Sequence, residues 1–110
     1  MTEAGPPSGS RLQATGEVDG DTAVIRLAGE MDLRSSEVLR NVADDLIENG
    51  ARRVVLDCSE LTFLDSGGLS VLVRLYQQLT QADGSFAMRG CDPFTRQVLE
   101  ITGLSRFIIE

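Results

Sequence analysis

The spacing of hydrophobic residues changes along the chain, and these changes predict its secondary structure. Some stretches alternate apolar and polar residues as strands do, and others are short apolar runs typical of buried strands. Strands are predicted at 11–18, 22–28, 54–57, 85–89 and 106–109. Asp19-Gly20-Asp21 between the first two is a tight-turn signal, so these two strands are expected to form an antiparallel hairpin.

Three other segments carry apolar residues at helical spacing. Helices are predicted from a cap at Ser35 or Ser36 to the Asn49-Gly50 stop, from about Ser66 to Leu79, and from Pro93, capped by Asp92, to Gly103. In the third helix, Phe94, Val98 and Ile101 share one face. The resulting order, β-β-α-β-α-β-α-β, predicts a single α/β domain with a mixed, mostly parallel sheet and helices packed on it.

Composition bounds the domain and its surroundings. Residues 1–10 are rich in Pro, Gly and Ser and predict a flexible N-terminal tail, which leaves residues 11–110 for the domain. The chain has no signal-peptide pattern and no apolar run of about 20 residues, so we expect a cytoplasmic protein without membrane contact. A net charge of -7 makes an average surface that repels nucleic acid.

The residue types that are missing exclude several kinds of chemistry. The chain contains no histidine, which rules out Ser-His-Asp and Cys-His catalysis as well as histidine metal sites. Neither a metal nor a cofactor is therefore expected. Cys58 and Cys91 each follow the end of a predicted strand. Buried, inert thiols are the favoured interpretation, and a regulatory disulfide requires their Cα atoms to come within about 7 Å.

The stretch from Val54 to Leu79 passes from a short strand through a brief loop into the second helix. The junction reads Leu64-Asp65-Ser66-Gly67-Gly68-Leu69, in which Ser66 stands at the expected N-cap and the glycines leave its hydroxyl accessible. A purely structural cap is one interpretation. A phosphate added to Ser66 is another, because a helix N-terminus tolerates an anion whereas a docked partner would meet new charge and bulk.

Two catalytic or ligand-binding interpretations of the same junction have less support. A nucleophile elbow has the pattern Gly-x-Ser-x-Gly and needs a base, and the chain offers neither that pattern nor a histidine. A phosphate-binding loop of the Walker type needs Gly-x-x-x-x-Gly-Lys-[Ser/Thr], and the chain contains no lysine.

The junction and two other stretches resemble those of STAS-domain anti-sigma factor antagonists. In this family a strand leads to Asp-Ser-Ser/Thr-Gly at the start of a helix, as in VVLDCSELTFLDSGGLSVLV here. Gly29-Glu30-Met31-Asp32-Leu33 is similar to a second family stretch, and Ile101-Thr102-Gly103-Leu104 to a third. The three matches occur in the family's order and span roughly Gly16 to Ile109.

The resemblance implies a binding protein, not an enzyme, that switches partners during bacterial transcription regulation and stress response. Its unphosphorylated form would bind an anti-sigma factor that is also a serine kinase, freeing the sigma factor. Phosphorylation of Ser66 would release that kinase, and a PP2C-type phosphatase would reverse the change. The residues that the resemblance places at the partner surface are Asp32, Asp65, Ser66, Gly67, Gly68 and Leu69.

Gly67 and the end of the chain depart from the family pattern. Gly67 replaces a second hydroxyl residue, which removes a helper or alternative acceptor, and many relatives continue beyond the position of Glu110 into a final helix. The alternatives that remain open are a STAS scaffold subunit, of a stressosome-like or lipid-transport assembly, and a nucleotide-binding module.

Overall fold

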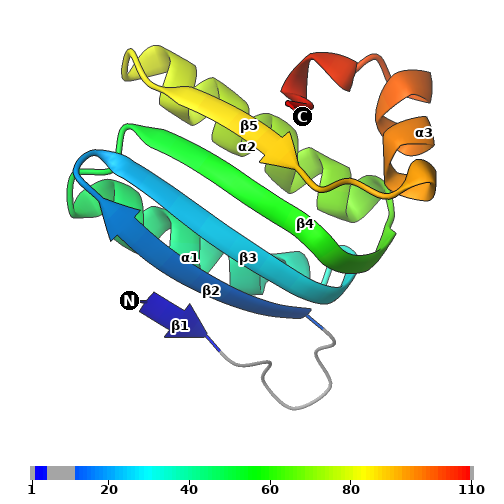
Figure 1. The fold of residues 1–110 in the computed structure, drawn as a ribbon, viewed down its shortest axis with the longest axis horizontal. Coiled ribbons are helices and arrows are strands. Elements are labelled where there is room, and N and C mark those ends of the chain that lie inside the picture. The colour runs from blue at the N-terminus through cyan, green and yellow to red at the C-terminus, as the bar shows by residue number, and fades with distance from the viewer. Residues whose placement is uncertain (1, 5–11, 110) are drawn as a thin grey trace.

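A computed structural model describes residues 2–4 and 12–109 of the chain. Five strands form one sheet in the order β1-β2-β3-β4-β5 (Figure 1). The strands are β1 (Thr2–Ala4), β2 (Leu12–Asp19), β3 (Thr22–Met31), β4 (Arg53–Leu64) and β5 (Ser85–Arg89). The helices are α1 (Ser36–Glu48), α2 (Ser66–Gln81), α3 (Pro93–Ile101) and the short 3-10 helix η1 (Ser105–Phe107). The first three strands pair antiparallel and the last three parallel, which confirms the predicted α/β fold.

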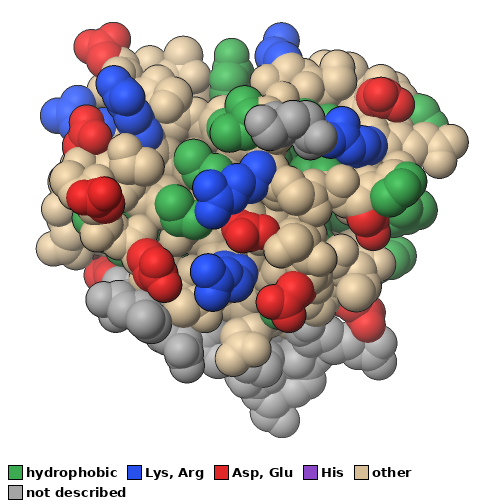
Figure 2. Space-filling model, viewed as in Figure 1, with side chains coloured by type: hydrophobic (Ala, Val, Ile, Leu, Met, Phe, Trp, Pro, Cys, Tyr) green, Lys and Arg blue, Asp and Glu red, His purple; other side chains and the backbone are tan. Residues whose placement is uncertain are grey.

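The hydrophobic core lies between one face of the sheet and helices α1 and α2, which lie side by side behind the strands in Figure 1. Alternate residues of the strands point into it, as Ala23, Ile25 and Leu27 do on β3. Leu39 of α1 and Leu72 of α2 are fully buried against this face. Figure 2 shows the opposite face of the sheet, where arginine and acidic side chains lie among apolar ones.

Strand β4 is much longer than the predicted strand at 54–57, and the brief loop expected after it is absent. The prediction is wrong because polar residues such as Ser59 and Glu60 interrupt the apolar run, whereas the backbone continues to pair with β3 as far as Met31 opposite Leu64. Two register shifts between β3 and β4, each with one extra residue on β4, accommodate the irregular spacing of the buried residues. The second strand of the predicted hairpin is likewise extended to Met31.

The strand predicted at 106–109 is also wrong, because Ser105–Phe107 forms η1 and a single bridge joins Ile108 to Met88. The turn lets the Phe107 ring pack between Tyr76 and Phe86, at centroid distances of 4.9 and 5.2 Å. In α3, Phe94 and Ile101 are 48% and 76% exposed, and Thr95 and Leu99 are the buried residues.

Within the expected flexible tail, Thr2–Ala4 pairs with residues 14–16 of β2 as an edge strand. This part of the prediction is wrong because composition does not reveal that β2 would otherwise present an unpaired backbone edge. Residues 1 and 5–10 of the expected tail lie outside the described residues. Among the helices of the described ranges, none combines the length and the apolar character needed to cross a membrane.

Candidate functional site

Ser66 is the first residue of α2, directly after β4, and its side chain is exposed. The predicted N-cap role of Ser66 is wrong, because the cap is Asp65, which accepts a hydrogen bond from the Gly68 N–H at 3.0 Å. Asp and Ser are almost equally good caps, so the sequence pattern cannot choose between neighbours. Within residues 2–4 and 12–109, the Ser66 hydroxyl makes no hydrogen bond. The cap is therefore complete without Ser66.

Gly67 and Gly68 allow the segment after β3 to approach the start of α2. A Cβ atom on Gly67 would lie 2.5 Å from Leu33 Cα, and one on Gly68 would lie 2.7 Å from the Met31 carbonyl oxygen. Neither position has room for a side chain unless the backbone moves. The sequence indicated that the glycines leave the serine hydroxyl accessible, and the structure adds that they are required by this packing.

Leu33 is a surface residue outside the six that were predicted at the partner surface. It is 72% exposed, and its backbone lies against Gly67. The Gly-Glu-Met-Asp-Leu stretch contains Leu33, but no periodicity in the sequence indicates that it reaches the start of α2. An exposed leucine beside an exposed serine makes a surface that is partly apolar and partly modifiable.

Asp32 holds the turn between β3 and α1. Its Oδ1 atom accepts a hydrogen bond from the Ser35 N–H at 2.8 Å and lies 2.9 Å from Ser35 Oγ, which is also 2.8 Å from the Glu30 carbonyl oxygen. These bonds, first the one from the Ser35 backbone and then the one from its hydroxyl, hold the pKa of the Asp32 carboxyl below its usual value of 3.8. Asp32 therefore positions the segment that carries Leu33.

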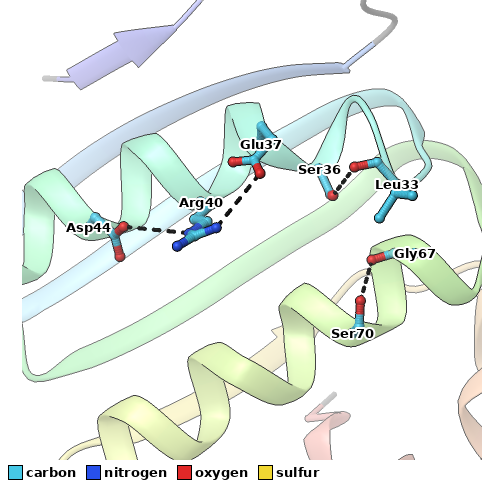
Figure 3. Close-up of polar contacts among 7 residues, drawn as sticks. All are labelled: Leu33, Ser36, Glu37, Arg40, Asp44, Gly67 and Ser70. Carbon is cyan, nitrogen blue, oxygen red and sulfur yellow. Dashed lines mark hydrogen bonds and ion pairs between the residues drawn. The ribbon is translucent and has the colours of Figure 1, made fainter.

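The predicted cap position of α1 at Ser35 is confirmed, but the expected side-chain cap bond is absent. Ser35 occupies the N-cap position without a side-chain cap bond, and the Ser36 hydroxyl donates to the Leu33 carbonyl oxygen at 2.9 Å (Figure 3). Asp32 accepts the Ser35 N–H instead, three residues along the chain. The Asp-x-x-Ser spacing is the sequence signal that could have indicated this turn.

The parallel pairing of β3 and β4 brings the two segments together. Met31 lies opposite Leu64 at the ends of these strands, and the Asp65 N–H donates to the Met31 carbonyl oxygen at 3.2 Å. We call the result the loop–helix surface. It consists of Asp32, Leu33, Asp65, Ser66, Gly67, Gly68 and Leu69, of which Gly68 is buried and Leu69 half-buried. The six residues predicted at the partner surface thus lie together, with Leu33 added.

A shallow groove of about 360 Å³ continues along α1 and α2. It is lined by Arg40, Asp44, Glu48, Val71, Arg74, Leu75 and Gln78. Arg40 pairs with Glu37 at 3.6 Å and with Asp44 at 4.0 Å on the exposed side of α1 (Figure 3). Such exposed pairs contribute little to stability.

The two cysteines lie elsewhere in the fold; neither forms a disulfide, and both side chains are buried. A hydrogen bond with Cys91, together with burial, raises the pKa of the Cys58 thiol. In the part of the chain that the structure describes, no cluster of three or more His, Cys, Asp or Glu residues could hold a metal ion.

The chain resembles known proteins over most of its length. The family profile described as "Mlab, STAS domain" matches residues 14–110. An anti-sigma F factor antagonist from Paenibacillus polymyxa is 30% identical over 98 residues, which cover 88% of this chain and 84% of that protein. An anti-sigma-B factor antagonist from Bacillus subtilis is 32% identical over 85 residues, which cover 76% of each chain.

A solved structure extends the likeness to three dimensions. The anti-sigma factor antagonist SpoIIAA in its unphosphorylated form has a TM-score of 0.77 and 28% identity, with 87% of this chain and 85% of that one covered. These relatives are named as regulatory binding proteins rather than enzymes. The resemblance drawn from the sequence is therefore confirmed, and the chain belongs to the STAS-domain family.

Proposed function

We propose that this protein is an anti-sigma factor antagonist that is switched by phosphorylation of Ser66. Its unphosphorylated form binds an anti-sigma factor that is also a serine kinase, and this binding frees the sigma factor in the cytoplasm. The observation that carries the proposal is the exposed Ser66 hydroxyl, which has no hydrogen bond to any described residue at the start of a helix capped by its neighbour.

The local chemistry of α2 suits a phosphorylated serine. The kinase transfers the γ-phosphoryl group of ATP to Ser66 Oγ, and a PP2C-type phosphatase hydrolyses the ester with water. The phosphate adds about two negative charges beside the N-terminus of α2, where, among the described residues of the cap and first turn, the only acidic side chain is the capping Asp65, which already accepts the Gly68 N–H. The fold should therefore persist after phosphorylation.

The same phosphate would oppose binding at the loop–helix surface. Leu33 offers exposed apolar area that a partner would desolvate, and the adjacent phosphate would have to lose water as well. Asp32 and Asp65 hold the two backbone segments in place, and Gly67 and Gly68 keep them close. Leu69 and Leu33 supply the apolar contact.

The structure offers a steric reason why position 67 is a glycine and not a second hydroxyl residue. A side chain on Gly67 would meet the Leu33 backbone at 2.5 Å, so a Ser or Thr there would displace the segment after β3. The next serine along α2, Ser70, donates its hydroxyl to the Gly67 carbonyl oxygen at 2.8 Å (Figure 3). These features favour Ser66 as the phosphate acceptor.

The proposal is tested by binding of the purified protein to serine-kinase anti-sigma factors of its own genome. We expect wild type to bind one of them, and Ser66→Asp to bind it at least about 100-fold more weakly, since a charge would be desolvated at the interface. Ser85→Asp is the charge-matched control, because Ser85 is exposed at the start of β5, the opposite end of the parallel strands. It should bind within about twofold of wild type.

Two outcomes would contradict the proposal. Equal binding by wild type and Ser66→Asp would remove Ser66 from the interface. Failure of wild type to bind any serine-kinase anti-sigma factor would reject the antagonist function and favour a scaffold or lipid-transport subunit of the same family.

A further inference from the structure

Cys58 and Cys91 come together from two adjacent parallel strands. The register of β4 and β5 pairs Asp57 with Arg89, so Cys58 and Gly90 follow next to each other and Cys91 comes one residue later. Gly90 has a φ of 71°, and a Cβ atom on it would lie 3.2 Å from the Ser59 nitrogen. The left-handed turn at Gly90 thus keeps the chain that leads to α3 against β4.

The thiols are close enough to react with each other. They share a hydrogen bond, and Cys58 Sγ also lies 3.8 Å from the Leu56 carbonyl oxygen. Cys91 lies one residue beyond the position opposite Cys58, so with strands about 4.8 Å apart and a rise of about 3.3 Å per residue their Cα atoms are expected about 6 Å apart. Disulfides join residues whose Cα atoms are roughly 4.4–6.8 Å apart. A bond between these cysteines therefore requires little movement of the backbone.

Access to solvent differs between the two thiols. Cys91 is 8% exposed and Cys58 is 1% exposed, so a small oxidant reaches Cys91 first. The hydrogen bond that the Cys58 thiol donates to Cys91, together with burial, raises the pKa of Cys58, so little of it is a thiolate at neutral pH. Cys58 is thus suited to be the second, resolving thiol, which attacks only after its neighbour is oxidised.

We propose that Cys58 and Cys91 form a reversible intramolecular disulfide when the protein meets a hydroperoxide. Cys91 Sγ attacks one oxygen of hydrogen peroxide, the O–O bond breaks, Cys91 becomes a sulfenic acid, and the other oxygen leaves as water. Cys58 Sγ then attacks the sulfenic sulfur, the S–O bond breaks and a second water departs. Two thiols lose two electrons and two protons in total, and one hydrogen peroxide is reduced to two water molecules.

The disulfide closes a loop of the chain that contains Ser66, the proposed phosphate acceptor. Residues 58–91 include the end of β4, Ser66, the whole of α2 and β5. The bond also ties the start of α3 to β4, since Asp92, directly after Cys91, is the cap of that helix. Oxidation would lower the conformational entropy of the unfolded chain and so stabilise the folded state of the segment that carries Ser66.

The test treats the reduced, full-length protein with hydrogen peroxide and follows intact mass and thiol alkylation. We expect a monomer lacking two hydrogen atoms, both cysteines protected from alkylation, and a dithiothreitol-sensitive peptide that links Cys58 to Cys91. The thermal unfolding midpoint should rise by about 5–15 °C for a loop of this length in a domain of this size.

Single variants provide the controls. Cys58→Ala and Cys91→Ala should show no protected pair and no rise in the unfolding midpoint, with Cys58→Ser and Cys91→Ser as substitutes if the alanine variants do not fold. Thiols that stay reduced in wild type, that form dimers between chains, or that oxidise to sulfinic acids without a linked peptide would overturn the proposal. The result does not depend on the antagonist function, because no partner protein is present.

Discussion

Helices α2 and α3 begin in the same way but present different chemistry. Each follows a parallel strand at the same edge of the sheet (Figure 1), and each is capped by an aspartate. Asp65 accepts the Gly68 N–H at 3.0 Å, and Asp92 accepts the Thr95 N–H at 2.7 Å. The cap itself therefore does not distinguish a functional helix start from a structural one.

The difference lies in the residues beside each cap. At α2, Gly67 and Gly68 pack against the segment after β3, and Ser66 points to solvent. At α3, the side chain that precedes the cap is Cys91, which is buried. The two glycines let the segment after β3 approach the start of α2, and together these segments form the exposed loop–helix surface. At the start of α3 the thiol is buried instead.

The largest effect on this comparison is expected from Gly68→Thr, which gives α2 the residue that α3 has at the same helical position. The new side chain would meet Met31 and Leu64, so the free energy of unfolding should fall by about 2–3 kcal/mol. Urea denaturation measures it. Ser70→Thr on the exposed side of α2 is the control, with a change below about 0.5 kcal/mol. Undiminished stability of Gly68→Thr would show that the close packing is not needed.

Removing either cap should have a smaller and similar effect. Asp65→Ala and Asp92→Ala should each lower the free energy of unfolding by about 1 kcal/mol, since each leaves one N–H of the first turn without its acceptor. Ser66→Ala should leave stability within about 0.5 kcal/mol of wild type. If Ser66→Ala lowered the free energy of unfolding and Asp65→Ala did not, Ser66 and not Asp65 would be the cap.

Thr95→Val sharpens the comparison at α3. The Thr95 hydroxyl is buried and has no hydrogen-bond partner in the described part of the chain. Valine has nearly the same shape without the polar group, so the free energy of unfolding should be unchanged or rise by up to about 1 kcal/mol. A clear loss of stability in calorimetry would indicate that the hydroxyl is satisfied by a bound water.

The turn before α1 provides a pH-dependent effect, the smallest in this series. The Ser35 hydrogen bonds lower the pKa of Asp32 below 3.8, so its ionised form stabilises the fold. That contribution is complete above this value and is lost as the pH falls through the lower, folded pKa. The stability difference between wild type and Asp32→Asn, measured in urea, should be constant from about pH 7 to 5 and shrink below about pH 4. A difference that grows on acidification would contradict the assignment.

Most of the fold follows from sequence periodicity. The hairpin, the three helices and the parallel pairing were predictable, because alternation, helical spacing and turn residues such as Asp83-Gly84 are local signals. The length of β4 was not predictable, because its second half is held by pairing with β3. The same applies to Thr2–Ala4, whose structure depends on the edge of β2.

The residues of the candidate site could be predicted from the sequence, but the contacts between them could not. The motif around Ser66 indicated the proposed acceptor, yet the choice of Asp65 as cap depends on where β4 ends. The role of Gly67 depends on Leu33, which is more than thirty positions away in the chain and becomes a neighbour only in the fold. Contacts between distant segments leave no periodic signal, so Leu33 could not be found from the sequence.

The most direct test of the account is to map phosphorylation and release in one experiment. Wild type is mixed with its serine-kinase anti-sigma factor and ATP, phosphopeptides are identified by mass spectrometry, and the complex is followed by size-exclusion chromatography. We predict phosphate on Ser66 alone, dissociation that parallels its appearance, and re-association after treatment with a PP2C-type phosphatase. A complex that persists with Ser66 fully phosphorylated, or phosphate on a different residue, would contradict the central claim.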